Sequence, residues 1–142
     1  MSQEFAGDLQ QNAIRTLYPL CKVPDFSKIC FEEHKFTRTT FNNYVKEIQL
    51  LFKRSITPGQ EDWAVFTNVC SSMVAFVSAF PDRNPEFSDI IVELINVVKD
   101  KTEVVRKNGA ILLAKLAADE GNNKIIRENH GFDVLMSLRG AL

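Results

Sequence analysis

The sequence lacks an excess of either charge and has no long apolar run. Its 142 residues include 17 basic and 18 acidic side chains, giving a formal net charge of -1. A balanced charge exerts no general attraction on nucleic acid or on an anionic membrane surface, so we expect no nucleic-acid partner. No uncharged apolar stretch reaches about 18 residues, so we also expect no insertion into a membrane.

Cysteine is scarce, with Cys21, Cys30 and Cys70 as its only occurrences. An odd set without metal-ligand spacing predicts neither a disulfide framework nor a zinc site, and the apolar neighbours of each thiol favour small core residues. Unpaired thiols fit a reducing compartment. The N-terminal residues also lack the basic and apolar regions of a signal peptide. We therefore expect a cytoplasmic protein, with the nucleus as the alternative.

Motifs for catalysis and cofactor binding are missing as well. The sequence contains no nucleophile elbow, no phosphate-binding glycine loop and no dinucleotide fingerprint. His34 and His130 have no second His or Cys at metal-ligand spacing. Glu32 and Glu33 are adjacent, so on a helix their carboxylates point apart. The sequence thus predicts a protein that is not an enzyme and that holds no cofactor or metal.

What the sequence has in abundance is helical periodicity. Apolar residues of 90–98 recur at the spacing of a wide helical stripe, and no segment alternates as a strand would. Proline, glycine and short polar links separate the predicted helices, with Asp25 and Thr102 as candidate N-caps. These helices cover 7–21, 25–33, 39–54, 61–80, 86–99, 103–119, 122–129 and 132–142. We predict a single all-α domain over residues 1–142.

The segment 87–142 resembles the armadillo repeat. It contains DIIVELINVVKD from Asp89, EVVRKNGAILLAKLAAD from Glu103, and EGNNKIIRENHGFDVLMSL from Glu120. In that family a short first helix ends in a glycine, a second helix has a leucine-rich face, and a long third helix ends in a Leu-x-x-Leu-Ala pattern. Here 122–129 resembles a first helix, 90–99 and 132–142 second helices, and 103–119 a third helix. The resemblance implies a right-handed α-α superhelix of about three irregular repeats.

The N-terminal half resembles the family less closely. Residues 12–21 and 63–80 are similar to third helices, 24–33 to a first helix and 41–52 to a second. Pro81 and Pro85 stand where another first helix is expected. Both chain ends fall inside a repeat, which suggests a fragment of a longer solenoid or a stack that self-associates through open ends. An unrelated helical bundle is the remaining alternative.

Two glycines have predicted roles in the helical stack. Gly131 follows the predicted first helix at a corner, where glycine tolerates a positive φ. Gly109, next to Ala110, lies inside the predicted third helix, where the missing side chain lets a neighbouring helix approach closely. The sequence therefore predicts one glycine that turns the chain and one that packs.

The resemblance also implies a concave groove, lined by the third helices, that binds extended peptides or partner helices. Aligning the candidate third helices gives three groove triplets: Gln11, Arg15 and Pro19; Cys70, Val74 and Ser78; Lys107, Ile111 and Lys115. Nuclear-import receptors of the family have Trp and Asn where Ile111 and Lys115 stand, so recognition of a basic import signal is not expected. An acidic or mixed peptide is expected instead. The alternative is that Lys107 and Lys115 only form a solvated face.

Phenylalanine is abundant, with 11 residues. One interpretation is a core filled by large side chains; the other is that some of them, with Tyr44 and Trp63, form an exposed anchor patch for a partner. The residues concerned are Phe26, Phe31, Phe36, Phe41, Phe52, Phe66, Phe76 and Phe80.

Taken together, the residues predict a non-catalytic protein–protein interaction module, either an adaptor or the assembly domain of a scaffold. Its partner would be a protein or a peptide, bound in the groove or on the Phe-rich surface. One alternative is a co-chaperone or small-GTPase regulator of armadillo type. The second alternative is a helical structural domain that self-associates as a homodimer through its open ends.

Overall fold

The computed structural model describes residues 38–138, with side chains from Asn42 onward, and this part of the chain is helical and contains no strand. The all-α prediction is therefore confirmed. Six α-helices and one 3-10 helix follow one another: α3 (Arg38–Ser55), α4 (Trp63–Ala79), η2 (Pro81–Ile90), α5 (Ile91–Asp100), α6 (Glu103–Leu116), α7 (Glu120–Glu128) and α8 (Gly131–Ser137). The helices predicted over 7–21 and 25–33 lie outside the described residues.

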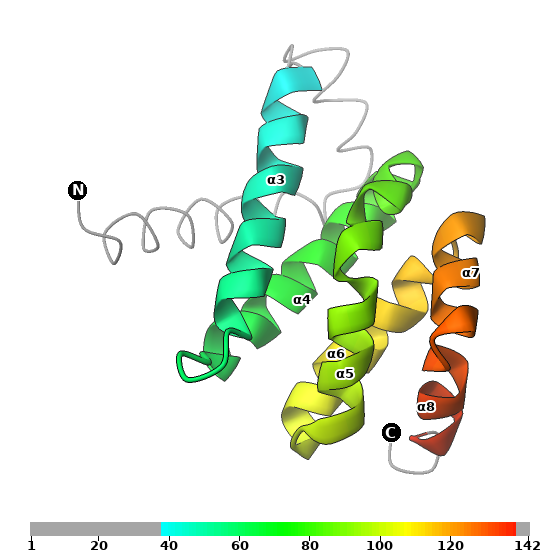
Figure 1. Ribbon diagram of the computed structural model, residues 1–142. Helices are drawn as coiled ribbons and strands as arrows, with labels where there is room; N and C mark the ends of the chain where they lie inside the picture. Colours follow the sequence, from blue (N-terminus) through cyan, green and yellow to red (C-terminus); the bar gives the residue numbers. More distant parts are fainter. Residues whose placement is uncertain (1–37, 139–142) are drawn as a thin grey trace.

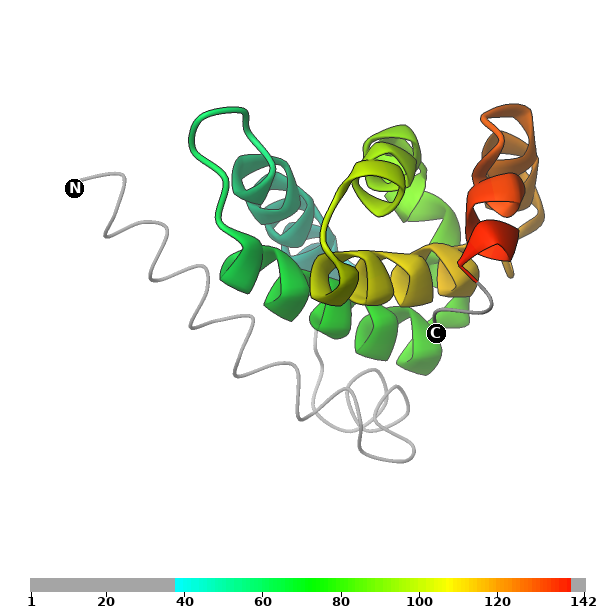
Figure 2. The ribbon, with the colours of Figure 1, turned by 90° about the horizontal axis from the view of Figure 1, so that it is seen from below.

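The helices form two rows (Figures 1 and 2). Figure 2 shows α3, α5 and the α7–α8 pair side by side in one row, with α4 and α6 together in the other. In Figure 1 the chain descends along α3 and returns along α4, then descends along α5 and returns along α6. Each descending helix thus belongs to the first row and each returning helix to the second.

Side-chain caps begin two of these helices. Val65 N donates to Asp62 Oδ1 over 3.1 Å at the start of α4, and Asn122 N donates to Asp119 Oδ2 over 2.9 Å at the start of α7. Each carboxylate satisfies an amide left without an intrahelical partner and complements the positive end of the helix dipole. Thr102 occupies the N-cap position of α6 as predicted, but its side chain makes no capping hydrogen bond.

The segment between α4 and α5 differs from the sequence prediction. We expected a break at Pro81 and Pro85 followed by a helix from residue 86, whereas residues 81–90 form the 3-10 helix η2 and the α-helix begins at Ile91. Pro81 stands in the first turn, where a helix needs no amide donor. Phe87 and Ile90 are buried, so this segment is part of the core.

One hydrophobic cluster extends from Tyr44 to Leu138. Its largest buried side chains include four phenylalanines, which are Phe52, Phe66, Phe76 and Phe87. Phe80 and Tyr44 are also buried, and Trp63 is half-buried against the cluster. For the buried rings the core interpretation holds and the anchor-patch interpretation is wrong, whereas half-buried Trp63 is left between the two. Phe26, Phe31 and Phe36 lie outside the described residues, and the side chain of Phe41 is not described.

The two predicted glycines both serve close packing. A Cβ atom at Gly109 would lie 2.8 Å from Val98 Cγ2, which confirms the predicted close approach of α6 to α5. A Cβ atom at Gly131 would lie 2.6 Å from Ile126 Cγ2 and 3.0 Å from Ile95 Cδ1. The positive φ at this corner belongs instead to His130, at 60°. The prediction for Gly131 was therefore wrong in its reason, because contact and not backbone angle requires glycine there.

A buried pair of asparagines joins η2 to the later helices. Asn122 Nδ2 donates to Asn84 Oδ1 over 2.8 Å and to Asn84 O over 3.1 Å. Asn84 Nδ2 donates in turn to Lys115 O over 3.2 Å, near the C-terminal end of α6. Because both amides are buried and hydrogen-bonded, the pair fixes α6 and α7 against η2 at little desolvation cost.

The helices of the described part do not have the length and apolar character needed to cross a membrane.

Candidate functional site

The residues predicted to line the α4 part of a groove are only partly accessible. Cys70 is buried, with 1% of its surface exposed, and its burial raises the pKa of the thiol far above the usual range. Val74 is half-buried and Ser78 is exposed, and the Ser78 hydroxyl donates to Val74 O over 2.6 Å. Cys70 therefore belongs to the core, while Val74 and Ser78 reach the surface. Gln11, Arg15 and Pro19 lie outside the described residues.

The residues predicted on α6 are all exposed and follow one side of the helix. We call them, with two exposed neighbours, the α6 stripe: Val104, Lys107, Ile111, Ala114 and Lys115. Ile111 is 47% exposed and Val104 67% exposed. Lys107, Ile111 and Lys115 are four residues apart, so they share a face and the apolar side chain stands between two ammonium groups.

The neighbouring helix α4 offers a surface of different character. Its fully exposed positions are Ala64, Asn68 and Ser78, all small or polar. In the same row, α6 presents large apolar and basic side chains. A partner that lay across both helices would therefore make its apolar and charged contacts with α6 and would meet small or polar exposed side chains on α4.

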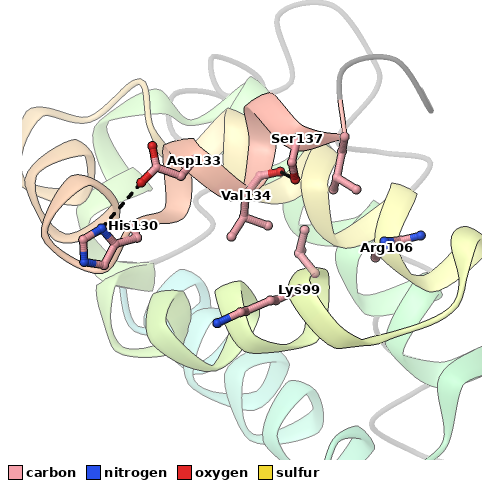
Figure 3. Close-up of a pocket in the computed structure, with 8 residues that line it drawn as sticks. Lys99, Arg106, His130, Asp133, Val134 and Ser137 are labelled. Carbon is pink, nitrogen blue, oxygen red and sulfur yellow. Dashed lines mark hydrogen bonds and ion pairs between the residues drawn. The ribbon is translucent and has the colours of Figure 1, made fainter.

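A concave feature lies between α5, α6 and α8, and we call it the α8 groove. Its volume is about 310 Å³, and it is lined by Val98, Lys99, Arg106, His130, Asp133, Val134, Ser137 and Leu138. Figure 3 shows α8 along one side of the groove, with Val134 and Ser137 facing Lys99 of α5 across it. The apolar lining comes from Val98, Val134 and Leu138, which belong to the edge of the hydrophobic cluster.

The charges of the α8 groove are unevenly paired. His130 Nδ1 lies 3.5 Å from Asp133 Oδ2 at one end, and Asp133 is the single acidic residue of the lining. Neither Lys99 nor Arg106 forms an ion pair with another described residue. Figure 3 shows these two side chains extending in opposite directions from the α5–α6 side of the groove. Two cationic groups thus flank an apolar centre.

The α8 groove was not predicted from the sequence, because its lining joins the consecutive helices α5 and α6 to α8, which lies farther along the chain. The local signals were present, since Lys99 ends one apolar stripe and Arg106 stands one position before the predicted Lys107. Nothing in the sequence indicated that α8 would lie beside both residues. Among residues 42–138, no group of His, Cys, Asp and Glu side chains could hold a metal ion.

No protein-family model, curated protein or solved structure matches the chain. The resemblance to armadillo repeats therefore depends on the residues quoted above, and the candidate surfaces are argued from their own chemistry.

Proposed function

We propose that this chain is a non-catalytic protein-interaction domain that binds a partner protein or peptide along the α6 stripe. The observation that carries the proposal is Ile111, a large apolar side chain left half in solvent between the lysines at 107 and 115. The exposed half of this side chain contributes no packing energy to the fold. The same residue would gain burial energy, with the lysines giving charge complementarity, when a partner covers it.

We further propose that the helices stack as an armadillo-like right-handed superhelix. The two rows of helices and the LAKLA sequence at the end of α6 support this arrangement. In a stack of this kind α4 and α6 play the part of third helices, and their exposed sides form one continuous face. On α4 this face carries small and polar side chains, and on α6 it carries basic and apolar ones. An acidic or mixed peptide with an apolar anchor is therefore the expected ligand.

The proposal is tested by quantitative affinity purification with three forms of the full chain. These are the wild type, the double variant Lys107→Glu/Lys115→Glu, and the control Lys46→Glu/Lys53→Glu, which reverses two exposed lysines on α3. Partners that use the α6 stripe should be recovered at least about tenfold less with the first variant and unchanged with the control. Equal recovery with all three forms contradicts the proposal.

The same preparations separate the two alternative functions. A regulator of chaperones or small GTPases would accelerate nucleotide release from a panel of purified Hsp70-type chaperones and GTPases. A self-associating domain would show a dimer mass by light scattering without any added partner. Monomeric behaviour, together with a flat response across the panel, leaves the interaction module as the function that the α6 stripe supports.

A further inference from the structure

We propose that the α8 groove is a second binding site, specific for a short acidic peptide in which an apolar residue stands between carboxylates. The site is separate from the α6 stripe. Arg106 and Lys107 are consecutive on α6, so their side chains leave the helix about 100° apart and serve different surfaces. The proposal goes beyond the function proposed above and stands whether or not the α6 stripe binds a partner.

The floor of the groove requires an apolar group in the ligand. Val134, which is half-buried, supplies most of the apolar surface that a ligand can reach, with Leu138, 7% exposed, beside it and the fully buried Val98 beneath. The volume of about 310 Å³ lies at the lower end of the range of about 300–1,000 Å³ seen for ligand pockets, and is suited to one aliphatic side chain with its flanking backbone. An inorganic anion or a sugar-phosphate chain would leave this apolar surface wet.

The rim of the groove requires negative charge. Lys99 and Arg106 have no acidic partner among the described residues, whereas the carboxylate of Asp133 is already beside His130. Arg106 is half-buried as a residue, and its planar guanidinium suits a two-point hydrogen bond to a carboxylate. Because the two cations extend in opposite directions, carboxylates on both sides of the apolar residue match them best.

The geometry also gives the peptide hydrogen-bonding groups along its path. Ser137 lines the groove, and because its hydroxyl donates to Val134 O over 2.7 Å, its oxygen remains able to accept a hydrogen bond from a peptide amide. An extended peptide between α5 and α8 would therefore have its side chain held by the floor, its carboxylates by the rim and one amide by Ser137.

The test uses a fluorescein-labelled nonapeptide with a central leucine and two acidic residues on each side, titrated with the full chain at low salt. We expect saturable binding by fluorescence polarisation. Binding should weaken at least about tenfold for Lys99→Glu/Arg106→Glu, and by a similar factor when the peptide leucine is replaced by serine. The control Lys46→Glu/Lys53→Glu should bind as the wild type does, and circular dichroism checks that each variant folds.

A second measurement locates the site without substitutions. Adding the peptide to ¹⁵N-labelled protein should shift amide resonances of residues 98–106 and 130–138 and leave those of α3 unchanged. The proposal is overturned if the charge-reversed variant binds equally well, or if the serine peptide binds as tightly as the leucine peptide. Displacement of the peptide by inorganic phosphate at the same concentration would also overturn it, since it would indicate a site for anions alone.

Discussion

The core is aromatic in the first helices and aliphatic in the later ones. In α3, α4 and η2 the rings touch one another: Phe76 lies 4.6 Å from Tyr44, 5.1 Å from Phe80 and 6.0 Å from Phe87 between ring centroids. Phe52 and Phe66 form a further pair at 5.6 Å. A few large side chains therefore fill the space between helices in this aromatic region, and Phe76, which contacts three other rings, lies at its centre.

The later helices, α5 to α8, are packed by smaller side chains, and at two positions by glycine. Their buried residues are mostly Ile, Leu and Val, and Gly109 and Gly131 let helices approach until no Cβ atom fits. Both candidate binding surfaces, the α6 stripe and the α8 groove, belong to this aliphatic region. If partners bind as proposed, the aliphatic region presents the contacts and the aromatic region supplies the packed scaffold beside it.

The largest effect should come from removing a ring at the centre of the aromatic region. Phe76→Ala deletes contacts with three other rings and leaves a cavity, so we expect a loss of about 4 kcal/mol in the free energy of unfolding. Leu112→Ala, an equally buried site in the aliphatic region, should cost about 3 kcal/mol. Urea denaturation followed by circular dichroism measures both. A larger loss at Leu112 than at Phe76 would contradict the proposed difference between the aromatic and aliphatic regions.

The second-largest effect is expected at Gly131. It tests whether the aliphatic region needs glycine there because of close packing and not because of the backbone angle. Gly131→Ala forces a methyl group against Ile126 and Ile95, and we expect a loss of about 2 kcal/mol from overpacking. The control is Gly121→Ala, at an exposed position of α7, where a Cβ atom would meet only Asp119 Oδ2, at 3.3 Å. Alanine there should not destabilise the protein, since its helix propensity favours a gain of up to about 1 kcal/mol. Thermal unfolding of both proteins gives the comparison. Similar stability for the two variants would refute the packing role of Gly131.

The buried asparagine pair joins the aromatic and aliphatic regions. Its loss should lower the free energy of unfolding slightly less than Gly131→Ala does. Asn122→Ala removes the donor to Asn84 and leaves buried acceptors unsatisfied, at an expected cost of about 1–2 kcal/mol. In a double-mutant cycle, adding Asn84→Ala should cost much less than it does alone, because the shared hydrogen bonds are already lost. Additive losses in the cycle would show that the two amides act independently.

The smallest effect concerns the polar contact between α3 and η2. Arg83 Nη1 donates to Asn42 Oδ1 over 2.8 Å and lies 3.2 Å from Glu86 Oε2. Arg83→Met keeps the apolar stem and should cost about 0.5–1 kcal/mol in low salt, with a smaller difference in about 1 M salt. Chemical denaturation at the two salt concentrations measures this. A cost independent of salt would assign the contribution of Arg83 to its hydrogen bond with Asn42 and not to the ion pair with Glu86.

The helices of both regions could be predicted from the sequence because apolar periodicity is strong, and α3, α4 and α6 begin and end near the expected residues. The 3-10 helix η2 could not, since two prolines signal an interruption without saying what replaces the α-helix. The exposure of Lys107, Ile111 and Lys115 agrees with their predicted position on one face. Cys70 was predicted to lie on a similar exposed face, but α4 is oriented so that this residue is buried in the core.

The α8 groove escaped prediction for a different reason. Lys99, Arg106 and His130 each look like solvated charges in the sequence, and only the packing of α8 beside α5 and α6 brings them together. A site whose residues meet only through tertiary contacts leaves no local pattern in the sequence. The α6 stripe, by contrast, lies on one helix, and three of its residues, Lys107, Ile111 and Lys115, were predicted from the resemblance of this helix to a third helix.

The most direct test of the account is photo-crosslinking from Ile111 in cells. A benzoylphenylalanine at position 111 is compared with the same residue at Val92, an apolar position of α5 with nearly equal exposure, 45% against 47%. The account predicts a discrete crosslinked partner from position 111, its loss in the Lys107→Glu/Lys115→Glu background, and no such product from position 92. Equal crosslinking from both positions, or none from 111 while 92 crosslinks, would contradict the α6 stripe as the binding surface.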